Sequence, residues 1–183
     1  RRRGNRMNLP NKLTIARMIA VPFFIAAYLL GYFPAALIIF ILASITDYFD
    51  GKIARSRNLI TNFGKIMDPL ADKILVYSAL CLFIESDIIA AWMLILILTR
   101  EFIVAGMRTV AASEGTVLAA GMSGKIKTFL QMVAVIVFLF ALCLKSAQST
   151  VMMIGNVIFW ASLVMTVYSG AEYVWKNRSV FSM

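Results

Sequence analysis

The sequence predicts an all-α integral membrane protein in which six transmembrane helices form one bundle. Of its 183 residues, 61% are hydrophobic, and the mean hydropathy is +0.85, which is more apolar than a soluble domain of this length. Six apolar segments follow one another, each close to the ~20 residues that a helix needs to cross a bilayer. These segments are residues 13–31, 34–55, 67–84, 88–107, 126–144 and 151–175. Turn-forming residues separate them, so we predict a single membrane domain over residues 1–183.

The distribution of Lys and Arg predicts how the helices are oriented. The termini and two connecting segments, 52–65 and 108–127, hold nearly all of the positive charge. Because cytoplasmic segments are enriched in Lys and Arg, we expect both termini and both basic segments to be cytoplasmic. The stretch Asn8-Leu-Pro-Asn11 is compatible with a short interfacial helix before the first span. The arginine-rich residues 1–6 are interpreted as a remnant of cloning ahead of a natural start at Met7.

Acidic residues are concentrated in one passage of this apolar chain. Four of the five aspartates lie within residues 47–72, and a carboxylate near hydrocarbon is costly unless it is paired or bound to metal. Asp47 and Asp50 are one turn apart at the inner end of the second span, and Asp68 and Asp72 are one turn apart at the start of the third. Each pair therefore lies on one helix face. Two antiparallel helices joined by a short loop bring both pairs to the same depth.

Two interpretations of this acidic cluster are open at this point. Oxygen-only ligands suit hard divalent ions, and two Mg²⁺ or Mn²⁺ ions would neutralise the four carboxylates. Alternatively, the aspartates form ion pairs with Lys65, Lys73 or Arg55 that fix the packing of the helices. The chain has no histidine, so any acid–base chemistry falls to Asp, Glu or Lys.

Small residues and one arginine follow the first acidic pair. Gly51 and Ala54 leave room for a large group to approach the helix backbone, although Gly51 alone would serve close helix–helix packing equally well. Arg55 offers a planar guanidinium to a phosphate. The stretch therefore favours a phosphate-containing ligand beside the acids.

The whole passage carries a family signature. It reads D-x-x-D-G-x-x-A-R, then eight residues, then G-x-x-x-D-x-x-x-D, from Asp47 to Asp72. This pattern resembles that of the CDP-alcohol phosphatidyltransferases, and the resemblance extends over the whole chain. It implies a six-helix membrane enzyme, typically a homodimer, that transfers a phosphatidyl group from CDP-diacylglycerol to an alcohol and releases CMP. It implies metal ligands at Asp47, Asp50, Asp68 and Asp72, with Asp72 also the general base. It implies a CDP-binding surface at Gly51, Ala54, Arg55 and Gly64.

Segments outside the signature indicate the acceptor alcohol. Residues 8–17, 99–108 and 115–128 resemble the branch of the family that makes phosphatidylglycerophosphate from sn-glycerol 3-phosphate, which fits a bacterial inner membrane. An acceptor that carries a phosphate needs cations, and Thr14 is a further candidate for a substrate contact. The candidate cations are Arg17, Arg108, Lys125 and Lys127, with Arg108 and Lys125 preferred. Lys125 and Lys127 cannot face the same way on a helix, so we expect one of them to meet lipid headgroups.

Alternatives stay open for the role of two charged residues, for the acceptor alcohol and for the class of protein. Arg100 and Glu101 lie deeper in the fourth span, where they form either an internal ion pair or a substrate contact. A member of the same family that uses serine or inositol would have the same metal site and a different acceptor pocket. A small cation transporter would also use intramembrane acids, but it would place them near the midplane and carry inverted repeats, which the sequence does not indicate.

Overall fold

The computed structural model describes residues 9–56, 62–116, 118 and 121–178, and it describes side chains for residues 15–46, 73–116, 118 and 121–178. Across these ranges the regular secondary structure is helical, with six helices joined by turns and short connections. The helices are α1 (Leu9–Leu29), α2 (Phe33–Ser56), α3 (Asn62–Glu85), α4 (Ala91–Ser113), α5 (Met122–Cys143) and α6 (Gln148–Lys176). The predicted all-α class is thereby confirmed for the described part of the chain.

Each predicted apolar segment lies largely within one helix, but several helices extend beyond the segments. α3 begins at Asn62, ahead of residue 67, and α4 continues to Ser113, past residue 107. Hydropathy marks only the part of a helix that suits hydrocarbon, whereas the backbone hydrogen bonds continue into polar sequence. α1 runs unbroken from Leu9, so the short interfacial helix expected ahead of the first span would precede this residue and stays a prediction. Residues 1–8, including Met7, lie outside the described residues.

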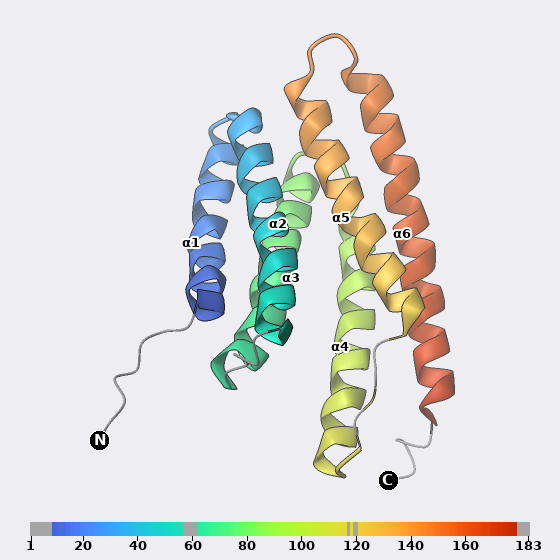
Figure 1. The fold of residues 1–183 in the computed structure, drawn as a ribbon. Coiled ribbons are helices and arrows are strands. Elements are labelled where there is room, and N and C mark those ends of the chain that lie inside the picture. The colour runs from blue at the N-terminus through green and yellow to red at the C-terminus, as the bar shows by residue number, and fades with distance from the viewer. Residues whose placement is uncertain (1–8, 57–61, 117, 119–120, 179–183) are drawn as a thin grey trace, which may run out of the picture.

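The helices run alternately in opposite directions, so the start of α1 and the end of α6 lie at the same end of the molecule (Figure 1). α5 and α6 form the most extensive helix pair, and α1 packs against both α2 and α3. α4 packs mainly against α6. The first three helices pack against the last three chiefly through the contact of α2 with α5. A polar space beside α5 would therefore be shared by both halves of the bundle.

A line of aromatic rings occupies the core where α3, α5 and α6 meet. Phe83, Phe138 and Phe159 are buried, and the ring centroid of Phe138 lies 5.3 Å from that of Phe83 and 5.9 Å from that of Phe159. Both pairs meet edge to face, an arrangement that the ring quadrupoles favour. Gly155 lets the backbone of α6 approach the Phe138 ring on α5, because a Cβ atom at this position would lie 2.7 Å from Cδ1 of Phe138.

Replacing Gly155 with alanine is expected to lower the melting temperature of the detergent-solubilised protein. The added methyl group would displace the buried Phe138 ring, and overpacking of this kind costs about 1–3 kcal/mol. Gly106→Ala on α4 is the matched control, because a Cβ atom at Gly106 meets nothing within 4 Å. Equal melting temperatures for the two variants would show that the ring moves aside without cost.

The outer surface of the bundle is apolar. α5 and α6 are long and apolar enough to cross a membrane, and shorter apolar stretches cover Ile15–Leu29 and Phe33–Thr46. Each helix also exposes large apolar side chains, for example Phe23, Leu42, Ile74, Phe102, Phe129 and Val164. Soluble proteins rarely expose apolar surface on every side, so we treat the chain as a membrane protein.

Candidate active site

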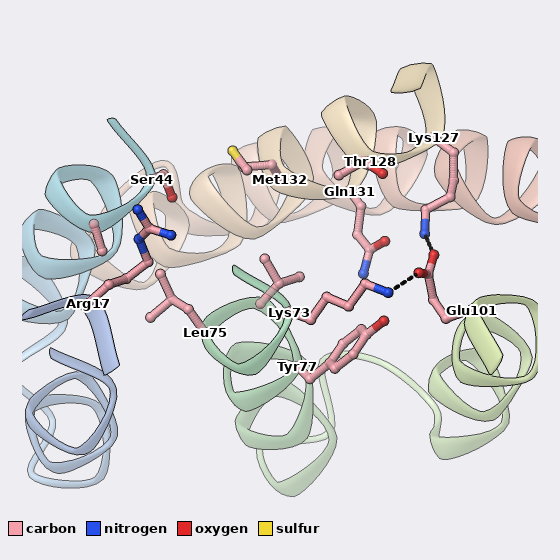
Figure 2. A pocket seen from close by; sticks show the side chains of 12 residues that line it. Arg17, Ser44, Lys73, Leu75, Tyr77, Glu101, Lys127, Thr128, Gln131 and Met132 are labelled. Atoms are coloured by element: carbon pink, nitrogen blue, oxygen red, sulfur yellow. Dashed lines mark hydrogen bonds and ion pairs between the residues drawn. The ribbon is translucent and has the colours of Figure 1, made fainter. Parts of the chain in front are cut away.

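A cavity of about 150 Å³ lies between helices α1 to α5. Apolar atoms form most of its wall, and several polar and charged side chains also line it. The polar residues are Arg17, Ser44, Lys73, Tyr77, Glu101, Lys127, Thr128 and Gln131. Figure 2 shows Arg17 reaching in from α1 on one side, while Lys127 and Glu101 meet on the other. A polar chamber inside an apolar bundle is where a membrane protein places a ligand site.

Glu101 is the centre of the charge network in this cavity. Its carboxylate accepts from Lys73 Nζ at 2.8 Å and from Arg100 Nη1 at 3.1 Å, and it also pairs with Lys127 Nζ. These cations come from α3, α4 and α5, so the carboxylate ties three helices together. Of the two roles left open for Arg100 and Glu101, the structure shows the internal ion pair.

The cavity carries more positive than negative charge among its described residues. Arg17, Lys73 and Lys127 line it together with a single carboxylate, that of Glu101. Arg17 and Lys127 are each only 3% exposed. Buried cations are retained where they are paired or where they serve a ligand. The excess of positive charge therefore suits an anionic ligand.

Two glycines make room for Arg100 beside this network. A Cβ atom at Gly124 on α5 would lie 3.0 Å from Nη2 of Arg100, and one at Gly170 on α6 would lie 3.0 Å from its Cγ. The arginine therefore lies between α4, α5 and α6 because both neighbouring positions lack a side chain. It supports the cavity wall and does not line the cavity itself.

The cavity adjoins both acid-bearing segments. Ser44 lines it one turn before Asp47 on α2, and Lys73 lines it directly after Asp72 on α3. The backbone is helical over residues 47–50 and 68–72, so the spacing that places each acidic pair on one helix face holds. The side chains of the four aspartates lie outside the described part. Within that part, no group of three or more His, Cys, Asp or Glu residues is placed to hold a metal ion.

Two of the four predicted acceptor cations line the cavity, from opposite sides. Arg17 and Lys127 line it, whereas Lys125 is exposed and does not. The opposite placement of Lys125 and Lys127 follows from their separation of about 200° around the helix. Arg108 lies elsewhere, with its guanidinium carbon 5.5 Å from the centroid of the Tyr173 ring and its Nε donating to the Tyr173 hydroxyl at 3.1 Å. The structure therefore does not bring the preferred pair, Arg108 and Lys125, to the cavity.

Sequence reasoning missed several residues that line the cavity. The sequence suggests an aspartate as the partner of Lys73, whereas the structure pairs it with Glu101. Gln131 was not considered, although its position four residues after Lys127 puts both on one face of α5. A polar residue one turn from a lysine within an apolar span was the signal that could have found it.

The other predicted site residues lie on the described backbone without described side chains. Thr14 is on α1, and Gly64 is on α3. Gly51, Ala54 and Arg55 are on α2, in the turns after Asp47. Their proposed contacts with substrate remain predictions.

Fold and cavity together define a helical membrane protein with a partly open cavity to which three cations and one carboxylate contribute. Comparison with known proteins gives the family. A sequence model of CDP-alcohol phosphatidyltransferase matches residues 7–168. The chain belongs to the CDP-alcohol phosphatidyltransferase family.

Similar proteins are found across bacteria. The CDP-diacylglycerol–glycerol-3-phosphate 3-phosphatidyltransferase of Bacillus subtilis is 43% identical over 93% of this chain and 95% of its own length. The proteins of the same name from Rickettsia prowazekii and Wigglesworthia glossinidia brevipalpis are each 39% identical. Those alignments cover 95% and 92% of this chain, and 97% and 93% of the relatives.

Proposed function

We propose that this chain transfers the phosphatidyl group of CDP-diacylglycerol to sn-glycerol 3-phosphate, giving phosphatidylglycerophosphate and CMP. The observation that carries the proposal is the cationic cavity beside the two acid-bearing helix segments. The names of the similar proteins support the same reaction. A serine or inositol acceptor is the alternative within the family, but neither carries the phosphate that a cationic cavity favours.

The aspartates supply the donor set for a divalent metal. We infer that Asp47, Asp50, Asp68 and Asp72 would hold Mg²⁺ or Mn²⁺, as two ions, because all four donors are carboxylates. When bound, the metal would offset the negative charge on the phosphate oxygens of the donor lipid. The family membership supports this assignment.

The reaction needs one proton transfer and one substitution at phosphorus, in which the acceptor oxygen replaces CMP. Asp72 accepts the proton of the acceptor hydroxyl, whose oxygen attacks the phosphatidyl phosphorus while the bond to CMP breaks. No histidine is available for this step, so a carboxylate is the natural base. Gly51, Ala54, Arg55 and Gly64 would hold the cytidine diphosphate portion of the donor, with Thr14 nearby.

The acceptor phosphate is assigned to the cavity cations. Lys127 donates one hydrogen bond to Glu101, and an ammonium group has three N–H donors, so it can bind a phosphate oxygen as well. Arg17 lines the opposite side of the same cavity (Figure 2). Together they would place the phosphate within reach of the segment that carries Asp72.

The membrane arrangement is part of the proposal. All six helices would span a bacterial inner membrane as one domain, with the chain ends and the active site facing the cytoplasm. The shared end of α1 and α6 and the positive charge of the connecting segments support this orientation. The functional unit would be a homodimer, as the family resemblance implies.

Incorporation of radiolabelled sn-glycerol 3-phosphate into chloroform-soluble lipid tests the function. Purified protein in detergent micelles with CDP-diacylglycerol should form the labelled lipid when Mg²⁺ or Mn²⁺ is present. EDTA should stop the reaction, and an excess of the metal should restore it. Formation that persists in EDTA would contradict the metal assignment, and no labelled lipid under any condition would contradict the function.

Replacing Lys127 with alanine is expected to raise the KM for sn-glycerol 3-phosphate about tenfold or more, since a hydrogen bond to a charged group contributes about 1.5–3 kcal/mol. The KM for CDP-diacylglycerol should change much less. Lys125→Ala removes the same group from an exposed position on the same helix and should leave both constants within about twofold. Equal increases in both constants for Lys127→Ala would move this lysine out of the acceptor site.

A further inference from the structure

The carboxamide of Gln131 has no role in the proposed chemistry so far. Gln131 is only 3% exposed, and its Nε2 atom has no hydrogen-bond partner among the described residues. A buried donor left without an acceptor destabilises a protein by about 1–3 kcal/mol, and such groups are rare in native structures. The amide nitrogen of Gln131 is therefore available to a ligand in the cavity.

The side chain is placed for such a ligand. Gln131 lines the cavity, and Figure 2 shows it directed from α5 into the space near Lys73. The hydroxyl of its neighbour Thr128 is already engaged, because it donates to the carbonyl of Gly124 at 3.0 Å. Gln131 therefore offers a neutral amide donor to a cavity that is also lined by three cations and by the hydroxyls of Ser44 and Tyr77.

The acceptor carries both a charged group and a neutral hydroxyl that these side chains could bind. A molecule of sn-glycerol 3-phosphate carries its secondary hydroxyl on the carbon between the reacting hydroxymethyl group and the phosphate ester. Lys127, one turn before Gln131 on α5, is assigned to the phosphate, and Lys73 directly follows the proposed base, Asp72. Gln131 lines the same cavity as both lysines, on the side towards Arg17 in Figure 2, so its amide is within the space that a bound acceptor would fill.

We propose that Gln131 donates a hydrogen bond to the secondary hydroxyl of the acceptor and selects three-carbon phosphates that carry this group. The inference rests on the proposed function and adds a specificity-determining residue to it. A site built around a buried donor discriminates strongly against an analogue that lacks the matching oxygen, because the donor then stays unpaired.

The test compares sn-glycerol 3-phosphate with 3-hydroxypropyl phosphate, which lacks only the secondary hydroxyl. CMP release with CDP-diacylglycerol gives kcat/KM for each acceptor in wild type, Gln131→Leu and Gln131→Met. Wild type should prefer sn-glycerol 3-phosphate at least about tenfold. Both variants should reduce this preference to within about threefold, through a loss on the sn-glycerol 3-phosphate side alone.

A matched control comes from α6. Asn156→Leu removes a half-buried amide whose Nδ2 donates to the carbonyl of Met152 at 3.2 Å, away from the cavity, and it should keep the wild-type preference. An unchanged preference in the Gln131 variants, or an equal loss for both acceptors, would overturn the inference while wild-type turnover still supports the function. Failure of wild type to use either acceptor would overturn the function and the inference together.

Discussion

Replacing Asp72 with asparagine is expected to reduce kcat by roughly 10²- to 10⁴-fold, the usual contribution of a general base. Asparagine keeps the size of the side chain and removes both its basicity and its negative charge. The variant should still bind donor lipid, because Gly51, Ala54 and Arg55 are unchanged. CMP release measures the loss, and the rise in melting temperature on adding CDP-diacylglycerol measures binding.

The fifth aspartate provides the matched control. Asp87 lies in the turn after α3, with a φ of 56°, a left-handed conformation that asparagine also tolerates. Asp87→Asn should therefore keep both stability and turnover. If Asp72→Asn retains activity within tenfold of wild type, Asp72 is not the base, and the proton must go to another group.

Glu101→Gln is expected to have the largest effect on stability. Removal of the charge would leave the buried Lys127 ammonium without its carboxylate, and breaking a buried pair in this way costs about 3–5 kcal/mol. For a chain of this length, such a loss corresponds to a fall in melting temperature of roughly 6–20 °C. Activity should fall as well, since Lys73 and Lys127 would lose the group that holds them at the cavity.

A second substitution separates charge pairing from packing. In Glu101→Gln/Lys127→Met, the buried Lys127 charge is gone while Arg100 and Lys73 still lack the carboxylate, so the double variant should recover part of the lost stability without recovering activity. Glu172→Gln is the control, because it removes the charge that pairs with the exposed Lys176 one turn along α6 at 2.5 Å. Glutamine can still accept the hydrogen bond from the Ser123 hydroxyl, so the melting temperature should change little. A Glu101→Gln variant as stable as wild type would refute the central role of this carboxylate.

The sequence allowed the helices to be predicted but not their ends. An apolar run of about 20 residues leaves few options for the backbone in lipid, and each of the six runs lies largely within one helix. The ends differ because polar residues such as Asn62 and Ser113 can continue a helix into water, where hydropathy gives no signal. The family assignment was also available from the sequence, since the spacing from Asp47 to Asp72 is a local pattern.

The cavity could be predicted only in part. Helix geometry alone shows that Lys125 and Lys127 face opposite ways, but which of them faces inward depends on how α5 is rotated against its neighbours. Arg108 illustrates the same limit, because α4 places it against Tyr173 on α6, a contact between residues distant in the sequence. The pairing of Lys73 with Glu101 likewise joins two helices, and no spacing within one helix encodes it.

One measurement tests the central claim most directly: release of CMP by the purified protein from CDP-diacylglycerol and Mg²⁺, with sn-glycerol 3-phosphate, serine and inositol offered in separate reactions. The account predicts release with sn-glycerol 3-phosphate alone, because only that acceptor carries the phosphate that Arg17 and Lys127 are assigned to bind. Release with serine or inositol, and none with sn-glycerol 3-phosphate, would contradict the acceptor assignment while leaving the family chemistry in place.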